Sequence, residues 1–373
     1  MKRILHIVGG MNQGGTENFI MNLYRNIDKN KIQFDFLVNR KGYFDDEILS
    51  MGGKIYYIPA LQKIGYFRYI KKLDDFFNKH KSEYRIVHSH INQVSGLILE
   101  RAKISNIPIR IAHSHNNNYA ANIFVRIYKE FLGRKIGINA THLFACSNDA
   151  SKFLFKNNSK SSYIIYNGVD YDKFKYSEKN RIEIRNKYKI SNDCFVIGNI
   201  ARFSAQKNHK FLIELFNQYV KNNPKSILLL IGEGKLEKKI KQEVNQLGLS
   251  KKVIFVGITG EANKYYSAFD SFVLPSHFEG LGIVLLETQI CGLKCICSKE
   301  GIPNEAKISD NIVYMSLKDS YRNWIKEISK INDRKNVKVE KKFDIKFITK
   351  KLFEFYVNEN NECLKGLKIS EKN

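Results

Sequence analysis

The feature that most constrains the fold is the alternation of short apolar, β-rich runs with amphipathic stretches. The first series of strand-like runs comprises residues 2–8, 32–38, 54–59, 85–90, 109–115, 142–147 and 162–167. After a polar stretch at residues 171–192, a second series comprises residues 195–201, 226–232, 253–257, 271–276 and 294–298. Strands that alternate with helices of about 10–15 residues are typical of βαβ units, whose strands form parallel sheets. The sequence therefore predicts an α/β protein with two doubly wound, Rossmann-like domains.

The length of the chain agrees with two domains. Its 373 residues exceed the roughly 250–300 residues at which a single hydrophobic core stops growing. Of these residues, 43% are hydrophobic and 12% aromatic, which is enough to fill two cores. We expect an N-terminal domain at residues 1–170 and a C-terminal domain at residues 171–345. We expect residues 346–373 to form a helix or tail that returns toward the N-terminal domain.

No segment of the sequence predicts a membrane span or a signal peptide. No run reaches the ~18 uncharged apolar residues that crossing a bilayer requires. The apolar stretch near the N-terminus covers only residues 4–8, which fits a first strand better than a signal peptide. We therefore expect a cytoplasmic protein.

The charge of the chain is strongly positive. It carries 62 lysines and arginines against 37 acidic residues, a formal net charge of +25. These cations are scattered, whereas nucleic-acid binding favours a dense stripe or a known module, so we expect no nucleic-acid partner. Two explanations remain: a compositional bias toward Lys, Asn and Ile, and attraction to an anionic membrane surface.

Residues 61–73, LQKIGYFRYIKKL, are the segment best suited to a membrane surface. Their apolar members Tyr66, Phe67, Tyr69 and Ile70 interleave with Lys63, Arg68, Lys71 and Lys72. Such a segment either lies on an anionic bilayer or packs its aromatic side into the first domain. If the segment lies on a bilayer, the sequence predicts a peripheral location at the inner face of the cell membrane.

The six cysteines predict neither disulfides nor a metal centre. Cys291, Cys295 and Cys297 cluster, but they lack CxxC spacing and a nearby fourth ligand. Cysteine packs readily as a small buried side chain, and that is the interpretation favoured here.

Ligand-binding residues are expected at the carboxyl ends of the strands, because parallel strands direct these ends toward one edge of the sheet. After the first strand, residues 9–18 read GGMNQGGTEN. Gly14 and Gly15 would allow a close backbone approach, and the following helix N-terminus offers amides to an anion. The spacing is not that of the GxGxxG dinucleotide motif.

Two His-x-His pairs end two further strands of the first domain. His88 and His90 end one, and His113 and His115 end the other. Residues two apart share one face of a strand, so the pairs could build a metal site, but no carboxylate accompanies either pair. A polar cluster lining the ligand site is the favoured interpretation, and ordinary hydrogen-bonded histidines are the third.

A cation pair follows the first strand of the second domain. Arg202 comes directly after that strand, and Lys207 lies five residues later at the start of a helix. A forked guanidinium, a point charge and oriented helix amides together form a good clamp for a diphosphate.

The segment SHFEGLGIVLLETQICG, residues 276–292, places two glutamates around a small-residue turn. Glu279 precedes Gly280-Leu281-Gly282, and the helix that follows is expected to run to residue 291. Glu287 lies in the second turn of that largely apolar helix, where an unpaired carboxylate would be costly. This pattern predicts one carboxylate for the reacting group of a ligand, another for vicinal hydroxyls, and amides between them for phosphate.

The segment FEGLGIVLLETQICG resembles the E-x7-E signature of retaining nucleotide-sugar glycosyltransferases of the GT-B fold, glycosyltransferase family 4. Further matches occur in the order of the family: GGTE, AHSHN, ACSNDA, YNGVDYDKF, ARFSAQKN, IGEG and VIFVG. The resemblance covers about residues 1–310 and is greatest to bacterial capsular or exopolysaccharide enzymes. It implies two Rossmann-like domains that face a cleft.

The resemblance also implies roles for the matched residues of the second domain. Arg202 and Lys207 would hold the donor diphosphate, and Glu287 the nucleotide ribose. Glu279, as a catalytic residue, and the amides of Gly280, Leu281 and Gly282 would contact the donor sugar.

In the first domain, the resemblance implies that Gly14 and Gly15 approach the phosphate. His115 aligns best with the catalytic histidine of the family, and His113 is the second choice. Asn116 and Asn167 would line the cleft. Three departures from the family pattern, Ala201, Thr288 and Lys294, remove no chemical group.

The implied reaction is the transfer of a hexose, with retention, from a nucleotide-sugar to a glycan or polyprenyl-diphosphate-linked acceptor in surface polysaccharide biosynthesis. A UDP-sugar is the first expectation and a GDP-sugar the second. Retention requires a carboxylate nucleophile or same-face attack assisted by the leaving phosphate, and same-face attack is favoured. No cofactor and no metal are expected, and Asp170-Tyr171-Asp172 is interpreted as structural despite its D-x-D pattern.

Two alternative functions accompany this interpretation. A sugar-nucleotide epimerase could share the fold and would act on the donor without an acceptor. A non-enzymatic basic protein that binds membranes or nucleic acid would not need Glu279, Glu287, Arg202 and Lys207 together.

Overall fold

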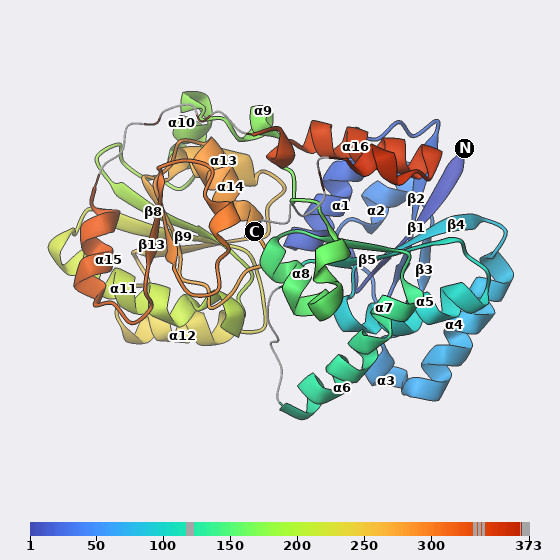
Figure 1. The fold of residues 1–373 in the computed structure, drawn as a ribbon. Coiled ribbons are helices and arrows are strands. Elements are labelled where there is room, and N and C mark those ends of the chain that lie inside the picture. Colours follow the sequence, from blue (N-terminus) through green and yellow to red (C-terminus); the bar gives the residue numbers. More distant parts are fainter. Residues whose placement is uncertain (117–122, 331–333, 335–336, 338–339, 366, 368–373) are drawn as a thin grey trace. The chain divides into compact units, whose positions relative to one another are not determined.

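The computed structural model describes residues 1–116, 123–330, 334, 337, 340–365 and 367. The chain divides into two compact units (Figure 1). Unit 1 comprises Met1–Gly168 and Lys341–Asn373, and unit 2 comprises Val169–Glu340. The C-terminal segment that belongs to unit 1 therefore begins at Lys341.

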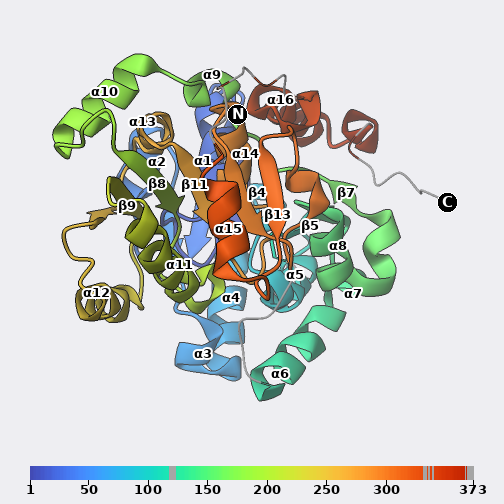
Figure 2. The same cartoon turned by 90° about the vertical axis from the view of Figure 1, so that its left-hand side faces the viewer.

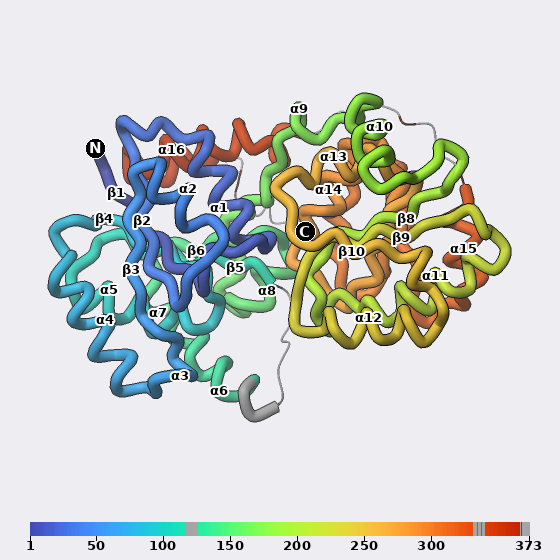
Figure 3. The backbone as a smooth tube through the Cα atoms, turned by 180° about the vertical axis from the view of Figure 1, so that it is seen from behind, coloured from blue at the N-terminus to red at the C-terminus, as the bar shows by residue number. Residues whose placement is uncertain are grey.

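The described part of unit 1 is built on a parallel sheet of seven strands in the order β3-β2-β1-β4-β5-β6-β7. The strands are β1 (Lys2–Val8), β2 (Ile32–Val38), β3 (Ile55–Tyr57), β4 (Tyr84–Ser89), β5 (Ile109–Ser114), β6 (His142–Ala145) and β7 (Tyr163–Ile164). Figure 3 shows β1, β2 and β3 from behind. The strand order reverses between β1 and β4, so the switch point where such sheets bind ligands lies at the carboxyl ends of these two strands.

Helices cover both faces of this sheet (Figure 1). They are α1 (Gly15–Asn26), α2 (Asp45–Ser50), α3 (Leu61–Ile64), α4 (Tyr66–His80), α5 (Ser95–Ile104), α6 (Ile123–Arg134), α7 (Ile136–Asn139), α8 (Asn148–Phe155) and α16 (Ile345–Asn358). Helices α1 and α16 pack their apolar sides with the sheet into one core. Helices α4 and α5 lie on the opposite face, where Leu73, Phe77, Leu97 and Leu99 are buried.

The sheet of unit 2 is also parallel, with its six described strands in the order β10-β9-β8-β11-β12-β13. The strands are β8 (Phe195–Ile200), β9 (Ser226–Ile231), β10 (Val253–Gly257), β11 (Ser271–Leu274), β12 (Cys295–Ser298) and β13 (Ile312–Met315). Here the order reverses between β8 and β11, which places the switch point at the ends of those strands.

The helices of unit 2 also form two layers. They are α9 (Tyr171–Phe174), α10 (Glu178–Lys187), α11 (His209–Asn222), α12 (Glu237–Gln246), α13 (Ala262–Ala268), α14 (Ile283–Ile290) and α15 (Tyr321–Ile328). Helices α11, α12 and α15 bury their apolar sides in one core with the sheet, and Figure 2 shows α11 and α15 in front of the strands. On the other face, Phe269 after α13 lies so close to β8 that a Cβ at Gly198 would come within 2.1 Å of its ring.

The predicted fold class is confirmed: both sheets are doubly wound and parallel. Strands β1 and β2 occupy the residues expected from the apolar runs, because both are long and buried. Strand β13 was missed, since its four residues are mostly half-buried and follow a polar stretch. The segment at residues 61–73 is not one helix, because Gly65 adopts a left-handed φ of 78° between α3 and α4.

Helix α16 is held in unit 1 by packing and by polar contacts. Its buried side chains include Ile348, Leu352 and Phe355, which lie in the same core as α1 and the sheet. At the end of this helix, Lys2 Nζ donates to the Val357 carbonyl over 2.6 Å. Strand β1 and helix α16 therefore support each other.

Truncation of Leu352 should destabilise unit 1 selectively. We expect Leu352→Ala to lower the free energy of unfolding of unit 1 by about 2–5 kcal/mol, because it leaves a cavity in a packed core. Native-state hydrogen exchange would show weaker protection in β1 and unchanged protection in β8. The exposed Lys350→Ala on the same helix is the control, and loss of protection in β8 alone would contradict the assignment of α16 to unit 1.

Candidate functional site

The switch point of unit 2 holds the residues that the sequence singled out in that domain. Arg202 follows β8 and is exposed, and among the described residues its guanidinium has neither a hydrogen bond nor an ion pair. Lys207 lies in a short 3-10 turn, Ala205–Lys207, that leads into α11. The turn ends at Asn208, whose φ of 53° redirects the chain into the helix.

The structure brings Lys207 and Glu279 together. Lys207 Nζ lies 2.6 Å from Glu279 Oε1. Glu279 follows β11 and is only 5% exposed, so its carboxylate depends on this cation for charge compensation. An ammonium group has three N–H donors, and the bond to Glu279 uses one of them.

Hydrogen bonds of the Gln206 side chain and of several backbone groups hold the loop that carries Glu279. Gln206 Nε2 donates to the Phe278 carbonyl over 2.8 Å, and the His277 amide donates to the Gln206 carbonyl over 2.8 Å. The Glu279 amide donates to the Gly301 carbonyl, also over 2.8 Å. Gly301 has a φ of 70°, and a Cβ there would lie 2.3 Å from the His277 carbonyl oxygen. Neither Gln206 nor Gly301 was foreseen, although Gln206 stands directly beside Lys207 in the sequence.

Helix α14 begins directly after the glycine turn. Gly282 is its N-cap with a left-handed φ of 77° and, as a glycine, has no side chain of its own to cap the helix amides. Gly280 and Leu281 are buried in the turn before it. The helix ends at Ile290, with Cys291 as C-cap, which agrees with the expected stop near Gly292. The positive end of a helix therefore lies next to Glu279 in the sequence.

Glu287 lies in the second turn of α14, as expected, and is almost completely buried. Tyr266 on α13 donates a hydrogen bond of 2.7 Å from its hydroxyl to Glu287 Oε2. Burial raises the pKa of Glu287 to about 7, and the bond from Tyr266 opposes this rise. Tyr266 was not foreseen, because no sequence pattern links α13 to α14.

In unit 1, Gly14 and Gly15 lie at the start of α1. Gly14 is the N-cap in an extended conformation and, as a glycine, has no side chain of its own to cap the helix. A Cβ built at Gly15 meets no atom within 4 Å, so this part of the loop is open. The amides of the first turn of α1 can therefore be approached closely, as an anion would require.

The four predicted histidines lie together, and a fifth joins them. His6 on β1 is paired in register with His88 on β4. The shortest imidazole distances are 3.0 Å from His6 Nδ1 to His90 Nε2, 2.9 Å from His90 Nδ1 to His115 Nε2, and 3.1 Å from His88 Nε2 to His113 Nδ1. His88 Nδ1 also lies 2.8 Å from the Tyr356 hydroxyl on α16. The sequence places His6 in an apolar strand, but the pairing of that strand with the strand of His88 is a finding of the structure.

These histidines are buried and uncharged. Burial lowers the pKa of His6 and of His115 to about 3, and it is also the main cause that lowers the pKa of the other three. His113 Nε2 has no partner among the described residues. The array therefore combines neutral rings, hydrogen bonds between them and several unused ring nitrogens.

The ring geometry favours hydrogen bonding over metal binding. Nitrogen atoms of His6, His88 and His90 lie within 4.8 Å of one another, as do those of His90, His113 and His115. In each triplet, however, two rings stack: His88 on His90 with centroids 4.2 Å apart and planes at 27°, and His113 on His115 at 4.1 Å and 28°. Imidazole lone pairs lie in the ring plane, so two stacked rings place them in separate, nearly parallel planes, which disfavours a shared ion.

The remaining candidates have more local environments. Asn167 is buried, and its Oδ1 has no partner among the described residues, whereas the Asn116 carbonyl accepts a bond from the Ser114 hydroxyl. Asp170 is the N-cap of α9 and accepts a hydrogen bond from the Lys173 amide over 3.2 Å. Asp172 pairs with Lys175 over 2.8 Å. The D-x-D carboxylates therefore have structural partners.

Family models match both halves of the chain. Residues 13–173 match the model described as Glycosyltransferase Family 4, and residues 180–338 match the model described as Glycosyl transferases group 1. The two matches cover most of the chain and meet near the boundary between the two units.

Several bacterial proteins are similar over most of their length. EpsF of Bacillus subtilis (strain 168), which is named as a glycosyltransferase, is 34% identical to this chain. The match covers 88% of this chain and 87% of EpsF. The capsular polysaccharide biosynthesis glycosyltransferase CapH of Staphylococcus aureus is 27% identical over 96% of this chain and 99% of its own. A UDP-Gal:alpha-D-GlcNAc-diphosphoundecaprenol alpha-1,3-galactosyltransferase of Escherichia coli is 26% identical over 69% of this chain and 67% of its own.

A solved structure shares the fold. Anabaena HepE, in complex with UDP and glucose, superimposes with a TM-score of 0.76 at 18% identity, over 95% of this chain and 99% of that chain. This likeness agrees with two Rossmann-like units of the GT-B type. Family models match both halves of the chain, and EpsF is 34% identical over 88% of it. The chain therefore belongs to the glycosyltransferases of polysaccharide biosynthesis, with a Glycosyltransferase Family 4 N-terminal half and a group 1 C-terminal half.

Proposed function

We propose that the chain is a retaining glycosyltransferase that transfers a sugar from a nucleotide-sugar to a glycan or polyprenyl-diphosphate-linked acceptor. The single observation that carries this proposal is the ion pair of Lys207 and Glu279 at the switch point of unit 2, with Arg202 exposed after β8. The cations can bind the negative charge of a diphosphate, and the carboxylate can accept a hydrogen bond from a sugar hydroxyl. The same small region therefore suits both parts of a nucleotide-sugar.

UDP is the proposed nucleotide and GDP the second choice. HepE is described in complex with UDP and with UDP-glucose, and the name of the E. coli relative contains UDP-Gal. The name of that relative also contains diphosphoundecaprenol, which supports a lipid-linked acceptor.

The proposed mechanism follows the charges that develop in the transition state. Positive charge spreads over the anomeric carbon, and negative charge over the departing diphosphate. Arg202, the two remaining N–H donors of Lys207 and the amides at the start of α14 would stabilise the diphosphate. The bond from Lys207 to Glu279 Oε1 withdraws negative charge from the carboxylate and lowers its nucleophilicity, which supports same-face attack assisted by the leaving phosphate.

We also propose that the reaction needs neither a metal ion nor a cofactor, the nucleotide-sugar being a substrate. Two protein cations are placed to meet the charge of the leaving group, and Asp170 and Asp172 already have structural partners. In unit 1, we propose that His115 contributes the active-site histidine.

The cation clamp can be tested by substitution. Hydrogen bonds to charged groups contribute about 1.5–3 kcal/mol, so Arg202→Ala should lower kcat/KM for the donor by roughly 10- to 150-fold. Lys207→Ala should lower it at least as much, because it also leaves Glu279 unpaired. Lys210→Ala, which removes an exposed lysine three residues away on α11, is the control. Donor kinetics that stay unchanged in both clamp variants would disprove the clamp.

The two glutamates should affect different steps. Glu287→Gln should mainly weaken binding of UDP, and Glu279→Gln should mainly slow sugar transfer at saturating donor. Calorimetry measures the first effect and initial rates the second. If UDP binding depends on Glu279 and not on Glu287, the two roles are reversed.

The pKa of Glu287, about 7, adds a pH dependence to the same experiment. Ribose hydroxyls donate to the ionised carboxylate, so UDP-glucose, whose diphosphate does not titrate in this range, should bind up to about tenfold more tightly at pH 8 than at pH 6. Glu287→Gln should abolish this dependence, whereas Glu279→Gln should retain it.

We further propose that the enzyme meets its acceptor at the inner face of the cell membrane. Among the described residues, no helix has both the length and the apolar character needed to cross a bilayer. Helix α4 buries Tyr69, Leu73, Phe76 and Phe77, so most of its apolar side packs inward. At its start, however, Phe67 is 86% exposed, next to Tyr66.

A second helix extends this exposed apolar area. On α6, Ile127 and Phe131 are each about 60% exposed, and Tyr128 is exposed between them. The pKa of Tyr128 is raised first by burial and then by the charge of Tyr66. Figures 1, 2 and 3 show α6 near α3 at the same end of unit 1. The α4–α6 surface, defined by Tyr66, Phe67, Ile127, Tyr128 and Phe131, lies beside the exposed cations of α3 and α4 and suits an anionic bilayer.

Vesicle sedimentation tests this surface. We expect binding to anionic but not to neutral vesicles at low salt, and at least ~100-fold weaker binding when Arg68, Lys71 and Lys72 become Glu, since each cation near the surface is worth ~1 kcal/mol. Glu replacement of Lys238, Lys239 and Lys241 on α12 is the control with the same charge change. Equal binding to both vesicle types, or to neither, would contradict the proposal.

A further inference from the structure

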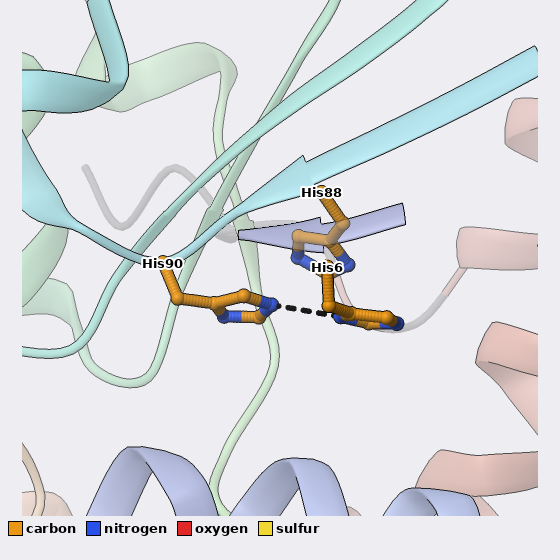
Figure 4. Close-up of side chains that lie close together, drawn as sticks. All are labelled: His6, His88 and His90. Carbon is orange, nitrogen blue, oxygen red and sulfur yellow. Dashed lines mark hydrogen bonds between the residues drawn. The ribbon is translucent and has the colours of Figure 1, made fainter. Parts of the chain in front are cut away.

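Three of the buried imidazoles form one continuous hydrogen-bonded chain. His90 contacts His6 through Nε2, at 3.0 Å, and His115 through Nδ1, at 2.9 Å. Figure 4 shows His6 and His90 joined through their ring nitrogens, with His88 as a separate neighbour. The histidine chain, defined here as His6, His90 and His115, thus leads from the middle of β1 to the carboxyl end of β5.

Each ring of the histidine chain is neutral, because burial lowers all three pKa values far below their usual range. A neutral imidazole has one N–H donor and one bare acceptor nitrogen. Each of the two contacts must contain a single proton, so the tautomers of the three rings depend on one another.

Only two arrangements satisfy both contacts. In the first, His6 Nδ1–H donates to His90, His90 Nδ1–H donates to His115, and the free proton of the chain lies on His115 Nδ1. In the second, both bonds run in the opposite direction, and the free proton lies on His6 Nε2. The two ends of the chain therefore decide which arrangement is stable.

The environments of the two ends differ. His6 Nε2 is buried without a partner among the described residues, and its ring packs against Phe34 and Phe36 with centroids 4.2 and 5.8 Å away. His115 Nδ1 also has no partner among them, but this residue follows β5 and is 6% exposed, against 0% for His6. An N–H without a partner is costly in an apolar core, whereas at a strand end a ligand can accept it.

We propose that His6 and His90 are positioning residues that hold His115 in the Nδ1–H tautomer, so that it offers a neutral hydrogen-bond donor to an oxygen of the donor substrate. This inference rests on the proposed role of His115 in sugar transfer. It adds that His115 acts as a donor, since Nδ1 carries the proton, and not as a base at that atom. A hydroxyl or phosphate oxygen is the matching acceptor.

The tautomer can be measured directly in the intact protein. With histidine labelled with ¹⁵N, long-range ¹H–¹⁵N correlation spectra distinguish Nδ1–H from Nε2–H, and His115→Gln identifies the signals of His115. We expect the Nδ1–H form at pH 7.5. Observation of the Nε2–H form in the unsubstituted protein would overturn the proposal whether or not the enzyme is active.

Substitution of His6 tests transmission along the chain. His6→Leu makes no change at His115 itself, yet it removes the donor to His90, and we expect His115 to gain a population of the Nε2–H form. His90→Leu should have the same effect in case His6→Leu does not fold. His88→Leu, which removes a buried histidine outside the chain, should leave the tautomer of His115 unchanged. A tautomer that is unaffected by both His6→Leu and His90→Leu would refute the positioning role.

Kinetics separate this role from the proposed function. His90→Leu should lower kcat for transfer about tenfold, the effect of roughly one hydrogen bond. It should have no further effect in a His115→Ala background, because it acts through that residue. An equal loss in both backgrounds would show a merely structural role. If His115→Ala leaves transfer unchanged, the catalytic role of His115 fails, while the tautomer measurement still decides the inference.

Discussion

The structure depends on one constraint, the parallel pairing of the strands in both sheets. Parallel strands all end at the same edge, and the reversal of strand order leaves an opening between two of these ends. In unit 1 the opening lies between β1 and β4, and in unit 2 between β8 and β11. Arg202 and Glu279 follow the strands at the opening of unit 2, and His90 and His115 lie at strand ends of unit 1. Helices cover the middle of each sheet on both faces, so these ends are where a ligand can approach.

At the opening of unit 2, a lysine and a glutamate compensate each other's charge. Glu279 is nearly buried, and Lys207 compensates its charge, while Arg202 is left in solvent. The pair compensates its own charge, and among the described residues no further side-chain bond engages the other lysine donors or Glu279 Oε2. Glu287 differs, because its partner Tyr266 is uncharged and burial raises the pKa of the carboxyl. The two carboxylates of the E-x7-E segment therefore have different electrostatic environments, as different roles would require.

Unit 1 uses neutral polar groups instead. Five histidines fill part of the core beside Phe34, Phe36 and Phe144. Burial keeps them uncharged, and they form hydrogen bonds among themselves and with Tyr356. Each ring has at least one hydrogen-bond partner, and His88 and His90 have two, so the network is compatible with a packed core. It also gives each ring a defined orientation, and the array ends where β4 and β5 end.

The sequence by itself determined the α/β class, nearly all the strands and the positions of the polar residues at strand ends. These features follow from local periodicity, since a strand of four to seven apolar residues and an amphipathic helix are visible in any short window. Only the tertiary structure decided which of these residues meet. The ion pair of Lys207 with Glu279, the bond from Tyr266 to Glu287 and the addition of His6 to the histidine array each join segments at least 20 residues apart. Such contacts depend on strand order and helix packing, which local periodicity does not encode.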